Sequence, residues 1–241
     1  QLIEGDILYV DFDTLVLRIS NTNAAGKGVI EAIVISSGLL GKNKGIVVDP
    51  QVSRRFEIST LSEKDIEAIQ LGLNHDITFV AASFIRNANA VRYVREISNG
   101  KMKIISKIEC LDALKNLDEI IRESNYLLID RGDLSKEIPI EKIPFTQKII
   151  LERAKSQSTD VFVATNLLES MISNRKPTRA EVHDIINTIV DGAYGLTLAA
   201  ETAIGKHPIG CINMLNKIIN HSDLVINAVE IKNKEKKFVQ Y

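Results

Sequence analysis

The sequence predicts an α/β fold built on a parallel β-sheet, with a small β-rich module in front of it. Residues 1–60 contain short apolar runs separated by Asp, Asn and Gly turns, whereas the chain from residue 61 alternates apolar runs with amphipathic helical stretches. Strands that are apolar on both faces and joined by helices are typical of a parallel sheet covered on both sides. We therefore predict five consecutive strand–helix units after the β module.

The β-rich module is predicted from apolar runs that are rich in β-branched residues and end at turn residues. The candidate strands are "DILYVDF" (6–12), "TLVLRIS" (14–20) and "VIEAIVIS" (29–36), followed by two apolar runs on either side of a Gly/Lys/Asn turn in "GLLGKNKGIVVDP" (38–50). No residue pattern here is typical of catalysis. A small structural β module is the favoured interpretation.

The second part of the chain opens with a helix in "STLSEKDIEAIQLGL" (59–73), which Thr60 or Ser62 could cap. Thr178 and Glu181 form a predicted capping box at the start of a later helix. The strands are expected at 77–85, 102–109, 126–130, 161–165 and 194–201, and the helices between and after them at about 88–98, 112–123, 141–156, 179–190 and 208–222.

Polar residues gather where each of these strands ends. The carboxyl ends of parallel strands meet at one edge of a sheet, which is where α/β enzymes place their active sites. Polar residues at one strand end are often helix caps, but five such ends favour a shared site. The residues concerned are Ser83, Arg86, Lys107, Glu109, Arg131, Asp133, Thr165, Glu201 and Thr202.

Lys107 and Glu109 lie two residues apart in a strand, so their side chains point to the same face. They form either a structural ion pair or part of an active site, and the spacing leaves both alternatives open. Glu109 and Asp133, from adjacent strand ends, could hold one Mg²⁺, which binds few protein carboxylates and keeps further positions for water and substrate oxygens. Lys107 beside such a cation suits phosphoryl transfer or enolate stabilisation.

Composition narrows the classes of partner. The net charge is −1 and the only charge run is "KNKEKK" (232–237), so we expect no nucleic acid and interpret that run as a solvated tail. No apolar stretch approaches the length of a membrane span. The two cysteines, Cys110 and Cys211, are far apart and predict neither a disulfide nor a metal site. The chain opens without Met inside a strand-like run, so we expect it to be part of a longer gene product.

Several motifs occur together in one order. They are "SEKDIEAIQLGL", "AASFIR", "IISKIE", "RGDL", "ESMI", "PTRAEVHDI" and "ETAIGKHP". On these motifs the chain resembles the pyruvate kinase family over roughly residues 60–220. The resemblance implies a (β/α)8 TIM-type barrel, of which about five βα units are present, with part of an inserted small β-barrel domain. It implies residues 1–58 as the end of that domain and linker, 59–228 as the partial barrel and 229–241 as a charged tail.

The resemblance also implies roles for individual residues. Lys107 would face the transferring phosphoryl group, and Thr165 would contact the substrate and lie on the proton route to the enolate. Glu109 and Asp133 would ligate Mg²⁺ or Mn²⁺, and Asp133 would thereby also contact the substrate. The backbone at Gly132 would bind the substrate carboxylate.

The implied reaction converts phosphoenolpyruvate and ADP to pyruvate and ATP, the final step of glycolysis. Ser83 matches a serine near the family's potassium site, so K⁺ is a second implied ion. The expected protein is a cytoplasmic homo-oligomer with no membrane or nucleic-acid partner.

This chain departs from the family pattern at several positions. Cys110 replaces Asn after "KIE", Asp130 replaces Ala before "RGD", and Asn166 replaces Gln after the Thr165 motif. Ile204 replaces a lysine that helps to bind nucleotide phosphates, which weakens the expectation of ADP. The first three barrel strands are also missing, so a longer parent chain or another chain would have to complete the barrel.

Three functional hypotheses remain open at this point. The first is a pyruvate kinase. The second is a metal-dependent lyase or aldolase that stabilises a pyruvate enolate without nucleotide. The third is a catalytically impaired regulatory or interaction module that keeps the barrel, motivated by Asp130, Ala199, Ala200 and Ile204.

Overall fold

The computed structural model describes residues 1–11, 15–41, 44–49 and 56–222. The chain divides into two compact units after Ser59, and each is described by itself. The expected tail at 229–241 and residues 223–228 of the expected barrel segment lie outside the described residues. Within the described part of the chain, no helix combines the length and apolar character needed to cross a membrane.

The first unit contains a four-stranded antiparallel sheet in the order β3-β2-β1-β4. Alternate side chains of its central strands are buried, among them Leu8, Val10, Leu15 and Ile19. The predicted runs at 6–12, 14–20 and 29–36 each contain a strand, but the described residues of the run at 38–41 do not form one. The elements are β1 (Ile7–Val10), β2 (Leu15–Asn21), η1 (Ala25–Lys27), β3 (Glu31–Ser36) and β4 (Ile46–Val48).

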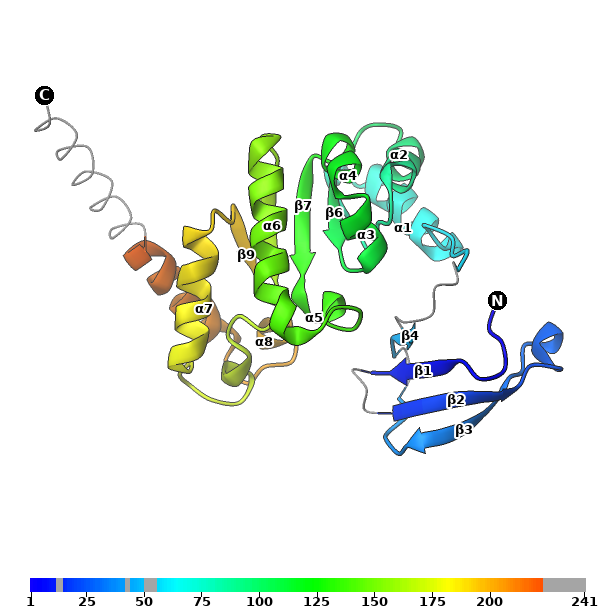
Figure 1. Cartoon of the computed structure of the whole chain (residues 1–241). Helices are drawn as coiled ribbons and strands as arrows, with labels where there is room; N and C mark the ends of the chain where they lie inside the picture. The colour runs from blue at the N-terminus through cyan, green and yellow to red at the C-terminus, as the bar shows by residue number, and fades with distance from the viewer. Residues whose placement is uncertain (12–14, 42–43, 50–55, 223–241) are drawn as a thin grey trace, which may run out of the picture. The chain divides into compact units, whose positions relative to one another are not determined.

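The second unit is built on a five-stranded sheet in the order β5-β6-β7-β8-β9. Figure 1 labels three of these strands, β6, β7 and β9. All four strand pairs are parallel, so the strands follow one another in space in their sequence order. The five predicted strands are confirmed, although the first and last are shorter than expected. The strands are β5 (Phe79–Ala82), β6 (Lys103–Ile108), β7 (Tyr126–Asp130), β8 (Asp160–Ala164) and β9 (Gly195–Thr197).

Helices follow each strand, as predicted, with differences at their ends. The helix expected at 112–123 is two helices that meet at Asn116, and the one expected at 141–156 begins at Ile143 after a short 3₁₀ turn. Residues 208–222 are helical. The elements are α1 (Glu63–Asn74), α2 (Ala88–Ile97), α3 (Leu111–Lys115), α4 (Leu117–Glu123), α5 (Arg131–Leu134), η2 (Ile140–Lys142), α6 (Ile143–Ser156), η3 (Glu169–Ile172), α7 (Arg179–Val190) and α8 (Ala200–Ala203).

Two helices start with the reciprocal hydrogen bonds of a capping box. The Ser62 hydroxyl accepts from the backbone N–H of Asp65, whose carboxylate accepts from the Ser62 N–H. Thr178 and Glu181 make the same pair of bonds at α7, which confirms the predicted box. Each box satisfies backbone donors that a helix N-terminus leaves without partners, and so fixes where the helix begins.

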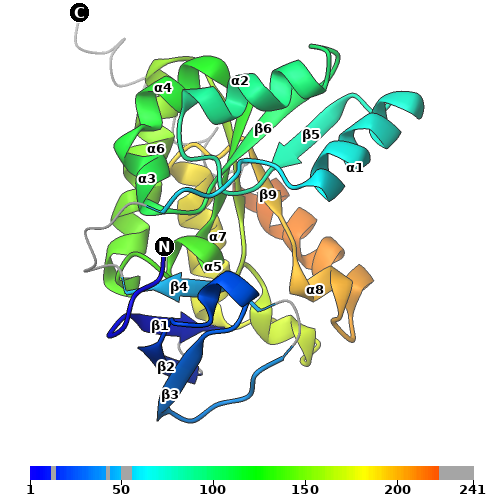
Figure 2. The same ribbon diagram turned by 90° about the vertical axis from the view of Figure 1, so that its right-hand side faces the viewer.

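Helices cover one face of the parallel sheet, which we call the helix-covered face (Figure 2). Its side chains are fully or almost fully buried and pack with apolar residues of α1, α2, α4 and α6 in one cluster. They include Ile104, Ile108, Leu127, Ile129, Val161 and Val163.

The opposite face, which we call the open face, is defined by Phe79, Lys103, Lys107, Tyr126, Asp130 and Phe162. No helix of the described residues packs over it in the two apolar clusters. Aromatic rings gather toward the strand starts, where the ring centroids of Phe79 and Phe162 lie 6.0 and 5.9 Å from that of Tyr126. The expectation of a sheet covered on both sides is therefore wrong for the described part of the chain. Apolar strands here indicate one helix-covered face and one partly exposed face.

Candidate active site

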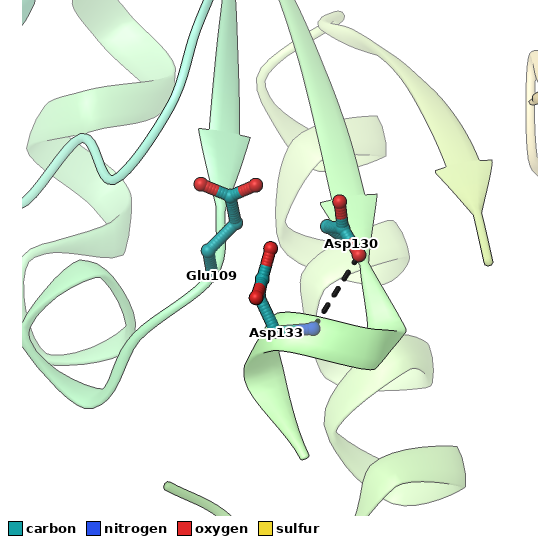
Figure 3. A group of neighbouring side chains, drawn as sticks. All are labelled: Glu109, Asp130 and Asp133. Carbon is teal, nitrogen blue, oxygen red and sulfur yellow. Dashed lines mark hydrogen bonds between the residues drawn. The ribbon is translucent and has the colours of Figure 1, made fainter. Parts of the chain in front are cut away.

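Three carboxylates converge at the carboxyl ends of β6 and β7 (Figure 3). Glu109 follows the last residue of β6, Asp130 ends β7, and Asp133 lies in the short helix α5 directly after it. One oxygen of each lies within 4.8 Å of the others. Because β6 and β7 are parallel neighbours, their ends meet at one edge, and the backbone turn at α5 brings Asp133 back toward that edge.

Lys107 lies among these carboxylates. Its Nζ is 2.5 Å from Glu109 Oε1 and 3.2 Å from Asp130 Oδ2. The same ammonium donates a long hydrogen bond of 3.5 Å to Ser83 Oγ. The prediction that Lys107 and Glu109 share a face is thus confirmed. They form an ion pair, and that pair is itself part of a cluster of charged groups at the sheet edge.

Glu109 is 1% exposed. Its Oε2 accepts a hydrogen bond of 2.6 Å from the Phe84 backbone N–H. Its Oε1 is buried and accepts no hydrogen bond of normal geometry from the described residues, although the Lys107 ammonium touches it. Burial raises the pKa of Glu109 above its ordinary value, and the interactions with Lys107 and the Phe84 N–H offset this only in part.

Lys107 and Asp130 are held in their ionised forms. Burial lowers the pKa of Lys107, but the carboxylates of Glu109 and Asp130 raise it more, so its pKa lies above the ordinary value. Burial raises the pKa of Asp130, but the hydrogen bond from Thr165 and the charge of Lys107 outweigh it, so that pKa lies below the ordinary value. A protonated lysine beside ionised Asp130 is the stable arrangement at neutral pH.

Thr165 and Gly132 approach each other closely beside this cluster. The Thr165 hydroxyl donates a hydrogen bond of 2.7 Å to Asp130 Oδ1. A Cβ at Gly132 would lie 2.8 Å from Thr165 Cγ2, a separation that real Cβ atoms essentially never show. Glycine is therefore needed at residue 132 for this close approach.

The Thr165 segment has an unusual backbone. Thr165 and Asn166 have φ angles of 77° and 56°, in the left-handed region that β-branched residues avoid. Arg131 donates from Nε and Nη2 to the Thr165 carbonyl at 3.1 and 2.7 Å, and from Nη1 to Asp184 at 2.7 Å. Such a backbone costs about 1–3 kcal/mol per residue and persists only where surrounding contacts hold it. Arg131, anchored by Asp184 of α7, supplies those contacts.

The fifth strand end does not join the cluster. Glu201 is buried, and its carboxylate accepts from the backbone N–H groups of Leu168 and Ala199 at 3.0 and 2.9 Å. The Thr202 hydroxyl donates to the Ala199 carbonyl. These residues secure the loops after β8 and β9, so the expected grouping of strand ends is met by β5 to β8 and not by β9.

Comparison with known proteins agrees with this architecture. A family model described as "Pyruvate kinase, barrel domain" matches residues 1–212. The chain belongs to the pyruvate kinase family. Proteins named pyruvate kinase from Thermotoga maritima and Methanocaldococcus jannaschii are 40% and 38% identical to it over 223 residues, and one from Sporosarcina psychrophila is 36% identical over 240 residues.

These alignments cover most of this chain and less than half of each pyruvate kinase. They include 91% of the chain for the T. maritima and M. jannaschii proteins and 97% for the S. psychrophila protein. The same alignments span 47%, 48% and 40% of those three relatives. The chain thus spans about half the length, or somewhat less, of the curated pyruvate kinases that it matches.

Two departures from the pyruvate kinase motifs have clear positions in the structure. Asp130, which stands where the family motif has Ala, is a full member of the carboxylate cluster. It is the last residue of β7 and lies on the same face as Lys107. Ile204 directly follows α8 and is 78% exposed, an unusual setting for a large apolar side chain.

Proposed function

We propose that this chain is part of an enzyme that transfers the phosphoryl group of phosphoenolpyruvate to ADP and forms pyruvate and ATP, the final step of glycolysis. The observation that carries the proposal is the Lys107 ammonium, paired with Glu109 and Asp130 where β6 and β7 end. A positive charge beside carboxylates that suit a divalent cation is the arrangement that phosphoryl transfer needs. Membership of the pyruvate kinase family supports the same reaction.

The proposed function is accompanied by a proposal for the fold of the complete enzyme. Strands β5 to β9 run in sequence order, and helices cover one face, as in a barrel whose interior is the other face. We propose that three further strands lie between β9 and β5 in the complete enzyme and close a (β/α)8 barrel. Residues 1–58 would then be the end of an inserted small β-barrel domain.

The donor set fits a divalent cation. Glu109, Asp130 and Asp133 offer only hard carboxylate oxygens, and Glu109 Oε1 is buried without a hydrogen bond of normal geometry from any residue that the structure describes. Glu109 and Asp133 would hold Mg²⁺ or Mn²⁺, and a potassium ion near Ser83 is a second proposal. The divalent cation would supply a positive charge that stabilises the phosphoryl oxygens and the enolate.

The chain's own residues would then act as follows. Lys107 would bind the phosphoryl oxygens as the phosphorus–oxygen bond to the enol breaks and a β-phosphate oxygen of ADP forms the new bond. The Gly132 backbone would bind the substrate carboxylate. The enolate left behind takes one proton at its methylene carbon, and the Thr165 hydroxyl, whose proton is held by Asp130 Oδ1, lies on that route. We further propose a cytoplasmic homo-oligomer.

The test uses the full-length natural protein with phosphoenolpyruvate, ADP, Mg²⁺ and K⁺, and follows pyruvate through lactate dehydrogenase. We expect turnover that requires all four components. Omission of ADP is the control that identifies phosphoryl transfer rather than hydrolysis. Pyruvate formation at the same rate without ADP, or none under any condition, would contradict the proposal.

One observation favours a second candidate. Ile204 presents an exposed apolar side chain where the family motif has a nucleotide-binding lysine. Without the positive charge of that lysine, the protein would act as a metal-dependent lyase or aldolase that stabilises a pyruvate enolate. Alternatively, it would serve as a catalytically impaired regulatory module. Exchange of the pyruvate methyl hydrogens for deuterium in D₂O, dependent on Mg²⁺ but without nucleotide turnover, would support the enolate chemistry. If neither hydrogen exchange nor nucleotide turnover is observed, that result would support the regulatory module.

A further inference from the structure

Asp130 links the groups of the candidate active site. Its Oδ1 accepts from the Asp133 backbone N–H at 3.4 Å (Figure 3). The same oxygen accepts from the Thr165 hydroxyl at 2.7 Å, and Oδ2 lies 3.2 Å from Lys107 Nζ. The family motif that the chain resembles has alanine at this position. The contacts of Asp130 are thus additions that this chain makes to its family's site.

The charges around Asp130 are not balanced. Three carboxylates face two ammonium groups, because Lys107 pairs with Glu109 and Asp130 while Lys136 pairs with Asp133 at 2.5 Å. The group of five side chains therefore has one more negative than positive charge. A divalent cation would reverse that imbalance, and carboxylate oxygens are the ligands that Mg²⁺ and Mn²⁺ prefer.

A second observation points to a cation at the same place. Glu109 belongs to the group, and its Oε1 is buried against the Lys107 ammonium, yet this oxygen accepts no hydrogen bond of normal geometry from the described residues. Within the part of the chain that the structure describes, the cation paired with this carboxylate is the Lys107 ammonium, which also contacts Asp130. The ammonium therefore occupies oxygens that a cation would need.

We propose that Asp130 is a third carboxylate ligand for the divalent cation, and that the cation displaces Lys107 from Glu109 and Asp130. This rests on the proposed metal site of Glu109 and Asp133, to which it adds a ligand. A third carboxylate makes cation binding less dependent on substrate oxygens. Displacement turns the Lys107 ammonium from its carboxylate partners toward the place where an anionic substrate binds.

The first test measures Mn²⁺ binding by electron paramagnetic resonance in the full-length protein without substrate. We expect Asp130→Ala, which restores the family residue, and Asp130→Asn, which keeps the shape, each to weaken binding about tenfold or more. Glu109→Gln should weaken it at least as much. Asp118→Asn, at an exposed carboxylate of α4, is the matched control and should change nothing. Thermal unfolding of each variant shows that it is folded.

The outcomes separate this inference from the proposed function. Binding that needs Glu109 but is equal or tighter in both Asp130 variants would overturn the inference alone, and Asp130 would be a counter-ion of Lys107. Binding that Glu109→Gln leaves unchanged would overturn the metal site on which both depend.

The second test follows the Lys107 amine by acetylation and mass spectrometry with and without Mg²⁺. Displacement predicts labelling of Lys107 that rises several-fold with Mg²⁺ in the natural protein. The exposed Lys115 on α3 is the internal control and should label equally in both conditions. Unchanged or reduced labelling of Lys107 on Mg²⁺ binding would overturn the displacement.

Discussion

The helix-covered face and the open face of the β5–β9 sheet come from the same strands, yet they carry different kinds of side chain. The helix-covered face is mostly apolar, with Ile104, Ile108 and Ile129 fully buried. The open face changes along the strands, from an aromatic group around Tyr126 at their starts to the charged cluster around Lys107 at their ends. Burial by helices stabilises the sheet on one side, and the other side can therefore hold charged groups at its edge.

The largest expected effect is a loss of folding stability when an aromatic side chain of the open face is removed. Phe79 is 46% exposed here, so its replacement by Ala would cost about 1 kcal/mol if nothing covers it. If three further strands close the barrel, Phe79 becomes a core residue of the full-length protein and Phe79→Ala costs about 3–5 kcal/mol. We expect the larger value in chemical denaturation of the full-length protein. A loss near 1 kcal/mol would mean that the face stays open.

On the helix-covered face, we expect a core substitution to lower the free energy of unfolding whether or not the barrel closes. Ile104→Ala removes a fully buried side chain from the main apolar cluster and should lower the free energy of unfolding by about 2–5 kcal/mol. The matched control is Ile204→Ala, at a largely exposed isoleucine of the same unit, which should stay within about 0.5 kcal/mol. Denaturant titration measures both. Equal losses would contradict the assignment of the two faces.

Lys103 and Lys107 of β6 lie at opposite ends of the open face, and replacing each one compares the two ends. Lys107→Met should lower the rate of phosphoryl transfer about 10²- to 10³-fold, since it removes a charge aimed at the reacting group. Lys103→Met, on the same face near the rings of Phe79 and Tyr126, should leave the rate nearly unchanged. The coupled assay on the full-length protein measures both rates. A comparable loss in both variants would argue against a site confined to the carboxyl ends of the strands.

The smallest expected effect concerns the helix layer. Burial raises the pKa of Glu181, but hydrogen bonds from Ser170 and Thr178 lower it more, so its pKa lies below the ordinary value. A depressed carboxylate pKa stabilises the fold above the unfolded-state pKa of about 4.3, and this stabilisation is lost as pH falls through the folded-state pKa. Because the side chain is partly exposed, we expect Glu181→Gln to cost only about 0.5–1 kcal/mol at pH 7.

Thermal unfolding at pH 7 and at pH 3 measures that dependence. The difference between Glu181→Gln and the natural protein should shrink at the lower pH. Glu152→Gln, on the exposed side of α6, is the control and should show no such change. A cost that stays the same at both pH values would show that the charge of Glu181 is not what stabilises the start of α7.

Local patterns predicted the elements well because they depend on neighbours in the sequence. The capping box of Thr178 and Glu181 needs only residues three apart, and the shared face of Lys107 and Glu109 needs only the two-residue repeat of a strand. The break of the helix at Asn116 was not predicted, because two short consecutive amphipathic helices have the same sequence pattern as one longer helix. The one-sided covering was missed for a different reason: periodicity shows that a strand is apolar, but not which element packs on each face.

The sequence by itself determined the alternation of strands and helices, the family motifs, and the residue types available for chemistry. Only the tertiary structure decided that Asp130 joins Glu109 and Asp133, that Lys107 pairs with two of these carboxylates, and that Glu201 secures loops instead of facing the site. The physical reason is that such contacts depend on the register between parallel strands and on loops that return across the sheet edge. Charges within a few ångströms then set each other's pKa and partners, and no local sequence pattern records those distances.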